Sequence, residues 1–231
     1  NSDEQADLLL ESAEQKIYDI RQGRVTRGPS KIGDIIVNEV YDKLQKLSNP
    51  AEREKYKGYT TGFIDLDKAI TGLNKSDLVI IGARPAMGKT AFVLSMAKNI
   101  AVDYKIPVAI FSLEMSNVQL VNRLIMNVCE IEGGKIRNGR LTQAEWEKLE
   151  HGITPLGEAP IYVDDTPGLS VFELRSKARK LVREKGIQII IIDYLQLMNA
   201  NGAFFGSREQ EVSIISRTLK GLAKELDIPV I

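Results

Sequence analysis

The segment that most constrains the fold of this chain is a short loop between an apolar run and a helical pattern. Residues Leu78 to Ile81 are continuously hydrophobic, and the loop that follows ends in Gly88-Lys89-Thr90. This order matches the strand, loop and helix of a phosphate-binding P-loop, with Ala83 in place of the usual first glycine. The structural alternative is an ordinary turn between a strand and a helix. The match to strand, loop and helix together favours a phosphate site.

Each part of such a loop has a physical role. Successive backbone N–H groups and the helix N-terminus form a cradle for the β-phosphate. Gly88 permits close backbone approach, Lys89 reaches the β- and γ-phosphates, and Thr90 can hold Mg²⁺. We therefore predict a nucleotide-binding segment made of Ala83, Arg84, Pro85, Ala86, Met87, Gly88, Lys89, Thr90 and Ala91.

The rest of the chain alternates between strand and helix patterns, which predicts an α/β domain. Apolar runs at 108–111, 161–163 and 187–192 predict strands, and the β-branched run 187–192 is typical of a central parallel strand. Four capping boxes predict helix starts, and they are Ser116 with Gln119, Thr142 with Glu145, Ser170 with Glu173, and Ser207 with Gln210. Residues 228–231 begin a further strand, so we expect a mostly parallel sheet flanked by helices and truncated at the C-terminus.

Two acidic residues follow predicted strands. Asp193 ends the run Ile189–Ile192, at the sheet edge where ligands of open α/β sheets bind. With the P-loop present, Asp193 is predicted to hold Mg²⁺ together with Thr90. Glu114 follows the strand at 108–111, where a carboxylate could orient and deprotonate water. The alternative for Glu114 is a surface acid that stabilises the start of the helix near Ser116.

The segment before the α/β pattern predicts two helices. Residues 1–30 combine an amphipathic helix with a polar linker, residues 31–62 contain a second helix and a connecting loop, and the main domain is expected over 63–231. The apolar face of the first helix could pack on its own domain or on a neighbouring copy, and periodicity alone leaves both open.

Composition excludes several classes of protein. Lys and Arg total 31 and Asp and Glu total 31 among 231 residues, so the chain is not a globally basic nucleic-acid coat. Cys129 is the single cysteine and His151 the single histidine, which excludes an internal disulfide and a multi-histidine zinc site. No apolar run approaches the ~20 residues of a membrane span, so we expect a cytoplasmic protein.

Several motifs in order resemble the DnaB-type replicative DNA helicases. The resemblance rests on Thr61–Asp67, Gly82–Thr90, Phe111–Met115, Ile192–Met198 and Ile215–Leu226. It implies a RecA-like P-loop NTPase motor with ATP and Mg²⁺ bound between the subunits of a homohexameric ring. It also implies that Lys89 and Thr90 bind phosphates and Mg²⁺, that Asp193 supports the metal, and that Glu114 is the catalytic base.

The same resemblance implies partners. The first helix looks like the linker helix that packs on the adjacent motor, and primase and a helicase loader are expected partners. The loop 199–206 resembles a channel loop facing single-stranded DNA, so Phe204, Phe205 and Arg208 are candidate DNA contacts. The family's arginine finger, which acts in trans, falls beyond Ile231, and these residues alone are therefore expected to be inactive.

Two other functions remain open at this point. One is a RecA- or RadA-like recombinase, which exchanges strands in an ATP-gated filament. The other is an ATP-binding helicase loader without turnover. The agreement at Arg84-Pro85-Ala86-Met87 and Asp193-Tyr194-Leu195-Gln196 favours the helicase, and the presence of Glu114 is against a protein without turnover.

Overall fold

The chain forms two compact units, residues 1–57 and 58–231. The computed structural model describes residues 13, 29–51, 57–198 and 208–231. The predicted helix within residues 1–30 lies almost wholly outside the described residues, and Phe204, Phe205 and Ser207 lie outside them too.

The described part of the first unit is a helix, as predicted for this segment. It runs through α2 (Ile32–Ile35), a π-helical stretch η1 (Ile36–Tyr41) and α3 (Asp42–Ser48). None of its residues is buried, and its large apolar side chains are exposed, namely Ile32, Ile36, Val37, Val40, Tyr41 and Leu44.

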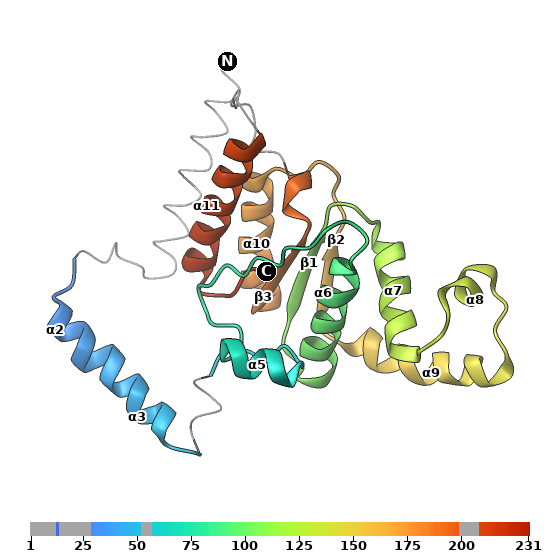
Figure 1. Ribbon diagram of the computed structural model, residues 1–231, viewed down its shortest axis with the longest axis horizontal. Helices are drawn as coiled ribbons and strands as arrows, with labels where there is room; N and C mark the ends of the chain where they lie inside the picture. Colours follow the sequence, from blue (N-terminus) through green and yellow to red (C-terminus); the bar gives the residue numbers. More distant parts are fainter. Residues whose placement is uncertain (1–12, 14–28, 52–56, 199–207) are drawn as a thin grey trace. The chain divides into compact units, whose positions relative to one another are not determined.

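The second unit alternates helices and strands, which confirms the predicted α/β class (Figure 1). Its strands are β1 (Val108–Ser112), β2 (Ile161–Asp164) and β3 (Ile189–Asp193). Its first helical segments are α5 (Ile64–Ile70), α6 (Lys89–Lys98) and the π-helical η2 (Asn99–Asp103), followed by α7 (Asn117–Cys129), α8 (Gly133–Asn138) and α9 (Gln143–Glu158). The later ones are α10 (Val171–Lys185), the 3₁₀ turn η3 (Leu195–Leu197) and α11 (Arg208–Leu226).

The sheet is parallel and has the order β2-β1-β3. Val108 pairs with both Ile161 and Ile189, so the three strands run in register. Beyond β3, Val230 forms parallel bridges to Ile190 on one side and to Leu78 on the other. The residues before Ile231 therefore lie between β3 and the segment that leads into the P-loop.

The predicted strand Leu78–Ile81 is shorter than expected. Its ladder is limited to the bridge at Leu78, where the N–H of Val79 donates to the Val230 carbonyl at 2.8 Å. Ile80 is 66% exposed, and residues 80–81 leave the sheet and line a pocket instead. A hydrophobic run predicts burial but not how many residues find a partner strand.

Both faces of the sheet are covered. Residues Val108, Ile110, Ile189 and Ile191 pack in one cluster with α6 and α7. The connections through α6 and α7 lead from the P-loop segment to β1 and then to β2. The connections through α10 and α11 lead in the opposite direction, from β2 to β3 and then to the segment at Val230. Right-handed crossovers then place α10 and α11 on the opposite face. The continuous burial of 189–191 confirms the predicted central strand.

Three predicted capping boxes form. Ser116, Thr142 and Ser170 each accept a bond from the backbone N–H three residues later, and the side chain at that position bonds back. The start of α7 gains a further bond, because Asn117 donates its N–H to Asp165 at 2.8 Å. The helix starts after β1 and β2 are thus fixed by local hydrogen bonds.

The α7–α9 pair packs closely around Cys129. This thiol is buried, and burial raises its pKa. Trp146, on α9, is 46% exposed, because α9 packs mainly on α7. Gly152 faces Cys129, where an added Cβ would lie 2.5 Å from Sγ and 3.3 Å from Cγ1 of Val128.

Gly152→Ala should therefore destabilise the second unit, although alanine is the better helix former. Overpacking typically costs ~1–3 kcal/mol, which exceeds the ~1 kcal/mol that alanine gains over glycine in a helix. The free energy of unfolding in urea measures the difference.

Gly157→Ala is the matched control in the same helix, because a Cβ there meets nothing within 4 Å. It should leave stability unchanged or raise it by up to ~1 kcal/mol. Adding Cys129→Ala to Gly152→Ala should recover part of the loss. Equal stabilisation by both glycine replacements would contradict the packing described here.

Candidate functional site

The predicted P-loop connects the sheet to α6. Gly88 is the N-cap of α6 and has a φ of 83°, a left-handed conformation that favours glycine. A Cβ at Gly88 would meet nothing within 4 Å, so the backbone conformation rather than space explains the glycine. Ala86 also has a positive φ, of 62°. The loop thus reaches the helix N-terminus through two left-handed residues.

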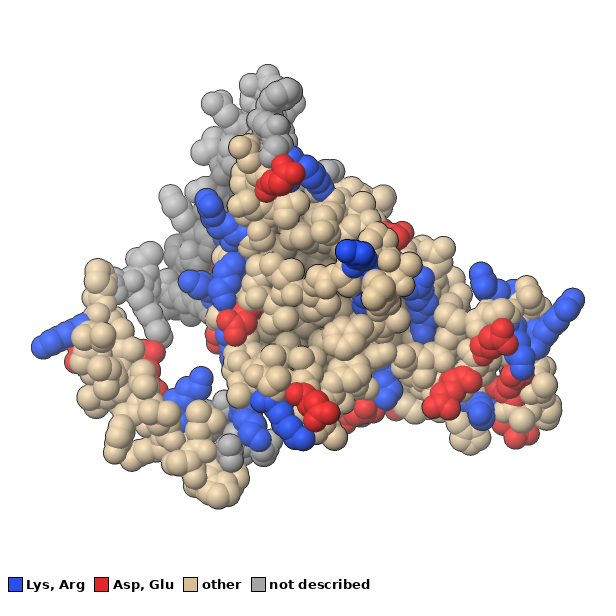
Figure 2. All heavy atoms as spheres, viewed as in Figure 1, with Lys and Arg blue, Asp and Glu red and all other residues tan. Residues whose placement is uncertain are grey.

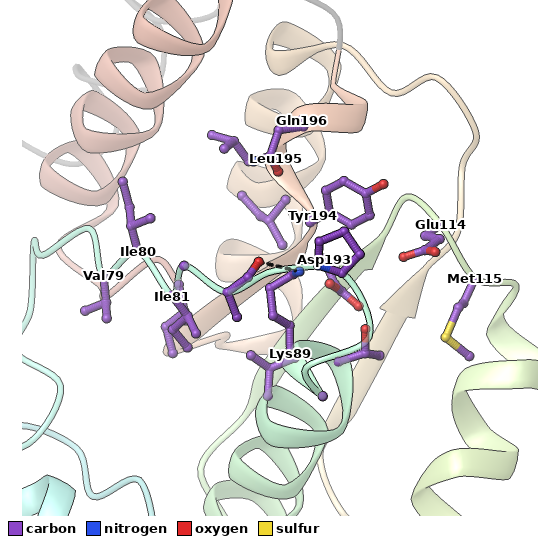
Figure 3. Close-up of a pocket in the computed structure, with 18 of the residues that line it drawn as sticks. Val79, Ile80, Ile81, Lys89, Glu114, Met115, Asp193, Tyr194, Leu195 and Gln196 are labelled. Carbon is purple, nitrogen blue, oxygen red and sulfur yellow. Dashed lines mark hydrogen bonds between the residues drawn. The ribbon is translucent and has the colours of Figure 1, made fainter. Parts of the chain in front are cut away.

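The ammonium group of Lys89 bends back over this loop. Its Nζ donates to the Ala83 carbonyl at 2.9 Å and lies 3.4 Å from the Arg84 carbonyl (Figure 3). Lys89 is the first residue of α6, and Thr90 is the second. The partial positive charge at the N-terminus of α6 and the positive charge of Lys89 therefore both lie beside the loop.

Asp193 and Glu114 come from neighbouring strand ends. Ser112 pairs with Asp193 in the sheet, and the N–H of Leu113 donates to the Asp193 carbonyl at 2.8 Å. Asp193 is only 6% exposed, whereas Glu114 is exposed two residues beyond the end of β1. In Figure 3 both carboxylates are on the pocket side of the strand ends, and that of Glu114 points toward Tyr194.

The turn that carries Glu114 is itself fixed. The buried Ser112 hydroxyl donates to the Met115 carbonyl at 2.7 Å and accepts from the Met115 N–H at 3.3 Å. Ser116 then caps α7. Glu114 therefore belongs to a short turn held at both ends, which limits where its carboxylate can reach.

These groups line one pocket of about 690 Å³. It brings together most of the predicted site, namely Ala83, Pro85, Ala86, Gly88, Lys89, Thr90, Glu114 and Asp193. Arg84, Met87 and Ala91 do not line it, and Met87 is 72% exposed. The pocket also has an apolar side formed by Leu78, Val79, Ile80, Ile81, Leu195, Leu219 and Ile231.

Sequence reasoning missed four polar or polarisable side chains in this pocket, Met115, Arg123, Tyr194 and Gln196. Met115, Tyr194 and Gln196 adjoin Glu114 or Asp193, so their proximity along the chain was an available signal. Arg123 lies within α7, and its place in the pocket depends on how α7 sits on the sheet.

The residues present fit a magnesium–nucleotide complex. Thr90 offers a hydroxyl and Asp193 a carboxylate, both hard oxygen ligands of the kind Mg²⁺ prefers. Among the described residues no cluster of three or more His, Cys, Asp or Glu side chains could hold a metal by itself. A site with few protein ligands suits Mg²⁺, which usually keeps several waters and substrate phosphates.

Arg208 lies at the first turn of α11. Its guanidinium donates to the Glu211 carboxylate and to the Gln196 carbonyl, which links α11 to η3. Contact of Arg208, Phe204 and Phe205 with DNA stays a prediction.

Over the face drawn in Figure 2, basic and acidic side chains are interspersed, in keeping with the balanced charge of the sequence. No helix in the described ranges is long and apolar enough to cross a membrane.

Comparison with known proteins assigns the second unit. Residues 58–231 match the family model described as DnaB-like helicase C terminal domain. The replicative DNA helicase DnaB of Nostoc sp. is 46% identical over 97% of this chain and 25% of its own length. That of Geobacillus stearothermophilus is 43% identical over 99% of this chain and 50% of its own length. The chain thus spans a quarter to a half of these relatives.

Solved structures agree. One of them, described as an ATPase domain, superposes with a TM-score of 0.79 at 35% identity, covering 88% of this chain and 70% of that one. A DnaB-like replicative helicase, described with its interactions with primase, gives 0.76 at 30% identity over 98% of this chain and 57% of that one. The predicted RecA-like α/β fold is confirmed. The chain belongs to the DnaB-like helicase C-terminal domain family.

Proposed function

We propose that this chain is the motor of a replicative DNA helicase, which hydrolyses ATP to move along single-stranded DNA and separate the strands. The observation that carries the proposal is the convergence of Lys89, Thr90, Asp193 and Glu114 on one pocket from three separate parts of the sheet. Membership of the helicase family supports the coupling of that pocket to DNA.

The chemistry follows from the residues around the pocket. Lys89 and the loop N–H groups would hold the β- and γ-phosphates of ATP, and Thr90 and Asp193 would hold Mg²⁺. The bound ion would neutralise charge that develops on the phosphate oxygens. Glu114 would orient a water molecule in line with the γ-phosphate and accept its proton. The buried Asp193 and the fixed turn at Ser112–Met115 support both positions.

The proposal includes partners. Single-stranded DNA is the expected track, and a homohexamer formed through the helix within residues 1–30 is the expected assembly. Primase contact is supported by the relative described with its primase interactions, and a helicase loader is proposed with it. As a replication protein, the chain would act in the cytoplasm.

The proposal is tested directly by unwinding. The full-length protein should separate a forked DNA duplex when ATP and Mg²⁺ are present and should hydrolyse ATP faster with single-stranded DNA. Strand exchange between homologous duplexes without fork unwinding would instead indicate a recombinase, and nucleotide binding without turnover would indicate a loader.

Lys89→Ala should weaken binding of Mg²⁺–ATP by about tenfold or more, because one charge-assisted contact to the phosphates is lost. Isothermal titration of the full-length variant with ATP and Mg²⁺ measures the affinity. Lys148→Ala is the charge-matched control, because Lys148 is exposed on α9 and does not line the pocket. Unchanged affinity in Lys89→Ala would mean that the loop is only a structural turn.

Glu114→Gln should separate nucleotide binding from hydrolysis. The amide keeps the shape of the side chain but cannot accept a proton, so turnover should fall ~10²-fold or more. Binding of Mg²⁺–ATP should stay near that of the unchanged protein. Steady-state ATPase rates with single-stranded DNA, beside a titration, check both parts. Turnover close to that of the unchanged protein would assign the base to another group.

A further inference from the structure

Ser112 is a buried polar residue at the end of an otherwise apolar strand. It is 2% exposed and follows the buried apolar residues 108–111 of β1. Unlike its neighbours Glu114 and Met115, it does not line the pocket. A buried hydroxyl costs free energy unless it is hydrogen-bonded, so the partners of Ser112 indicate what its side chain holds in place.

The hydroxyl of Ser112 bonds to the backbone of Met115. It donates to the Met115 carbonyl at 2.7 Å and accepts from the Met115 N–H at 3.3 Å. These two bonds close the turn 112–115, in which Glu114 is the third residue. The far end of the backbone that carries Glu114 is therefore tied to β1 by the Ser112 side chain.

The near end of the same turn is tied to the strand that carries Asp193. Ser112 pairs with Asp193 in the sheet, and the N–H of Leu113 donates to the Asp193 carbonyl at 2.8 Å. The Ser112 hydroxyl and this ladder bond together fix the backbone on both sides of Glu114. The distance between the proposed base and the proposed magnesium ligand therefore depends on these bonds.

Hydrolysis depends on this turn more strongly than nucleotide binding does. A general base must lie within hydrogen-bond reach of the water that it deprotonates, at about 2.6–3.2 Å between heavy atoms. A displacement of about 1 Å can cost ~10²-fold in rate. Binding of Mg²⁺–ATP, in contrast, is assigned to Lys89, Thr90 and the phosphate loop, and the Ser112 hydroxyl bonds to Met115 rather than to that loop.

We propose that Ser112 is a positioning residue for ATP hydrolysis, which holds Glu114 where it can accept a proton from water beside the γ-phosphate. This inference rests on the proposed ATPase function and deepens it. The hydroxyl acts through the turn that ends at Met115, and it touches neither the nucleotide nor the metal. Removal of the hydroxyl therefore lowers turnover and leaves nucleotide affinity nearly unchanged.

The first test compares turnover with affinity in the full-length protein. Ser112→Ala should lower the steady-state ATPase rate with single-stranded DNA by about 10- to 100-fold. Isothermal titration with Mg²⁺ and the non-hydrolysable analogue AMP-PNP should give a Kd within about twofold of that of the unchanged protein, the pattern of an interaction needed only for the reaction. Ser112→Cys should fall between in turnover, because a thiol has a similar shape but is a weak donor and acceptor.

A double-mutant cycle with Glu114→Gln tests whether the serine acts through the proposed base. Glu114→Gln already removes the proton acceptor, so adding Ser112→Ala should change the remaining turnover by less than about twofold. The same fold loss from Ser112→Ala in both backgrounds would mean that the serine affects hydrolysis by another route, and that result would overturn the inference.

Ser170→Ala is the matched control, because Ser170 is also a buried serine, 1% exposed, whose hydroxyl caps α10 and does not line the pocket. It should lose stability in urea, as Ser112→Ala should, but keep its turnover. If Ser112→Ala does not fold, Ser112→Cys takes its place in both tests.

Equal losses of turnover in the two serine variants, or full turnover without the Ser112 hydroxyl, would overturn the positioning role while the proposed function stands. If the unchanged full-length protein does not hydrolyse ATP, the proposed function fails and this inference fails with it.

Discussion

The parallel pairing of β1 with β3 is the interaction on which the site depends. Val108 to Ser112 pair with Ile189 to Asp193, and the N–H of Leu113 extends the ladder by one more bond to the Asp193 carbonyl. Parallel strands present their carboxyl ends at the same edge, so the acid that ends β3 and the acid that follows β1 meet there. If this register slipped by one residue, Asp193 would point to the other face of the sheet.

The P-loop joins this sheet indirectly. Val230 bridges both Ile190 and Leu78, so the residues just before the last one separate the loop segment from β3. Polar contacts hold the same junction, because Ser76 donates to Asp227 at 2.9 Å and Lys220 donates to the Ser76 carbonyl at 2.8 Å. The distance between the phosphate loop and Asp193 is therefore set by one intervening segment, which leaves room for a metal and phosphates between them.

The two halves of the site differ in how they are fixed. Glu114 and Arg123 belong to an element held by the Ser112–Met115 bonds, a capping box and buried leucines. The phosphate loop has few side-chain anchors besides Lys89, which bonds to the loop's own carbonyls. A rigid element beside a loop that can exchange these internal bonds for phosphate contacts suits the proposed cycle of nucleotide binding and release.

The sequence by itself determined the α/β class, the three capping boxes and the central strand at 189–191. It also predicted Lys89, Thr90, Glu114 and Asp193 as residues of one site, and all four line the pocket. These features are local, since they depend on a strand run, a cap or a motif within about ten residues. Tertiary structure decided that Leu78–Ile81 finds only one bridge, that Trp146 stays exposed and that Arg123 enters the pocket. Each of those outcomes depends on which distant segment lies alongside, and neither periodicity nor motif spacing carries that information.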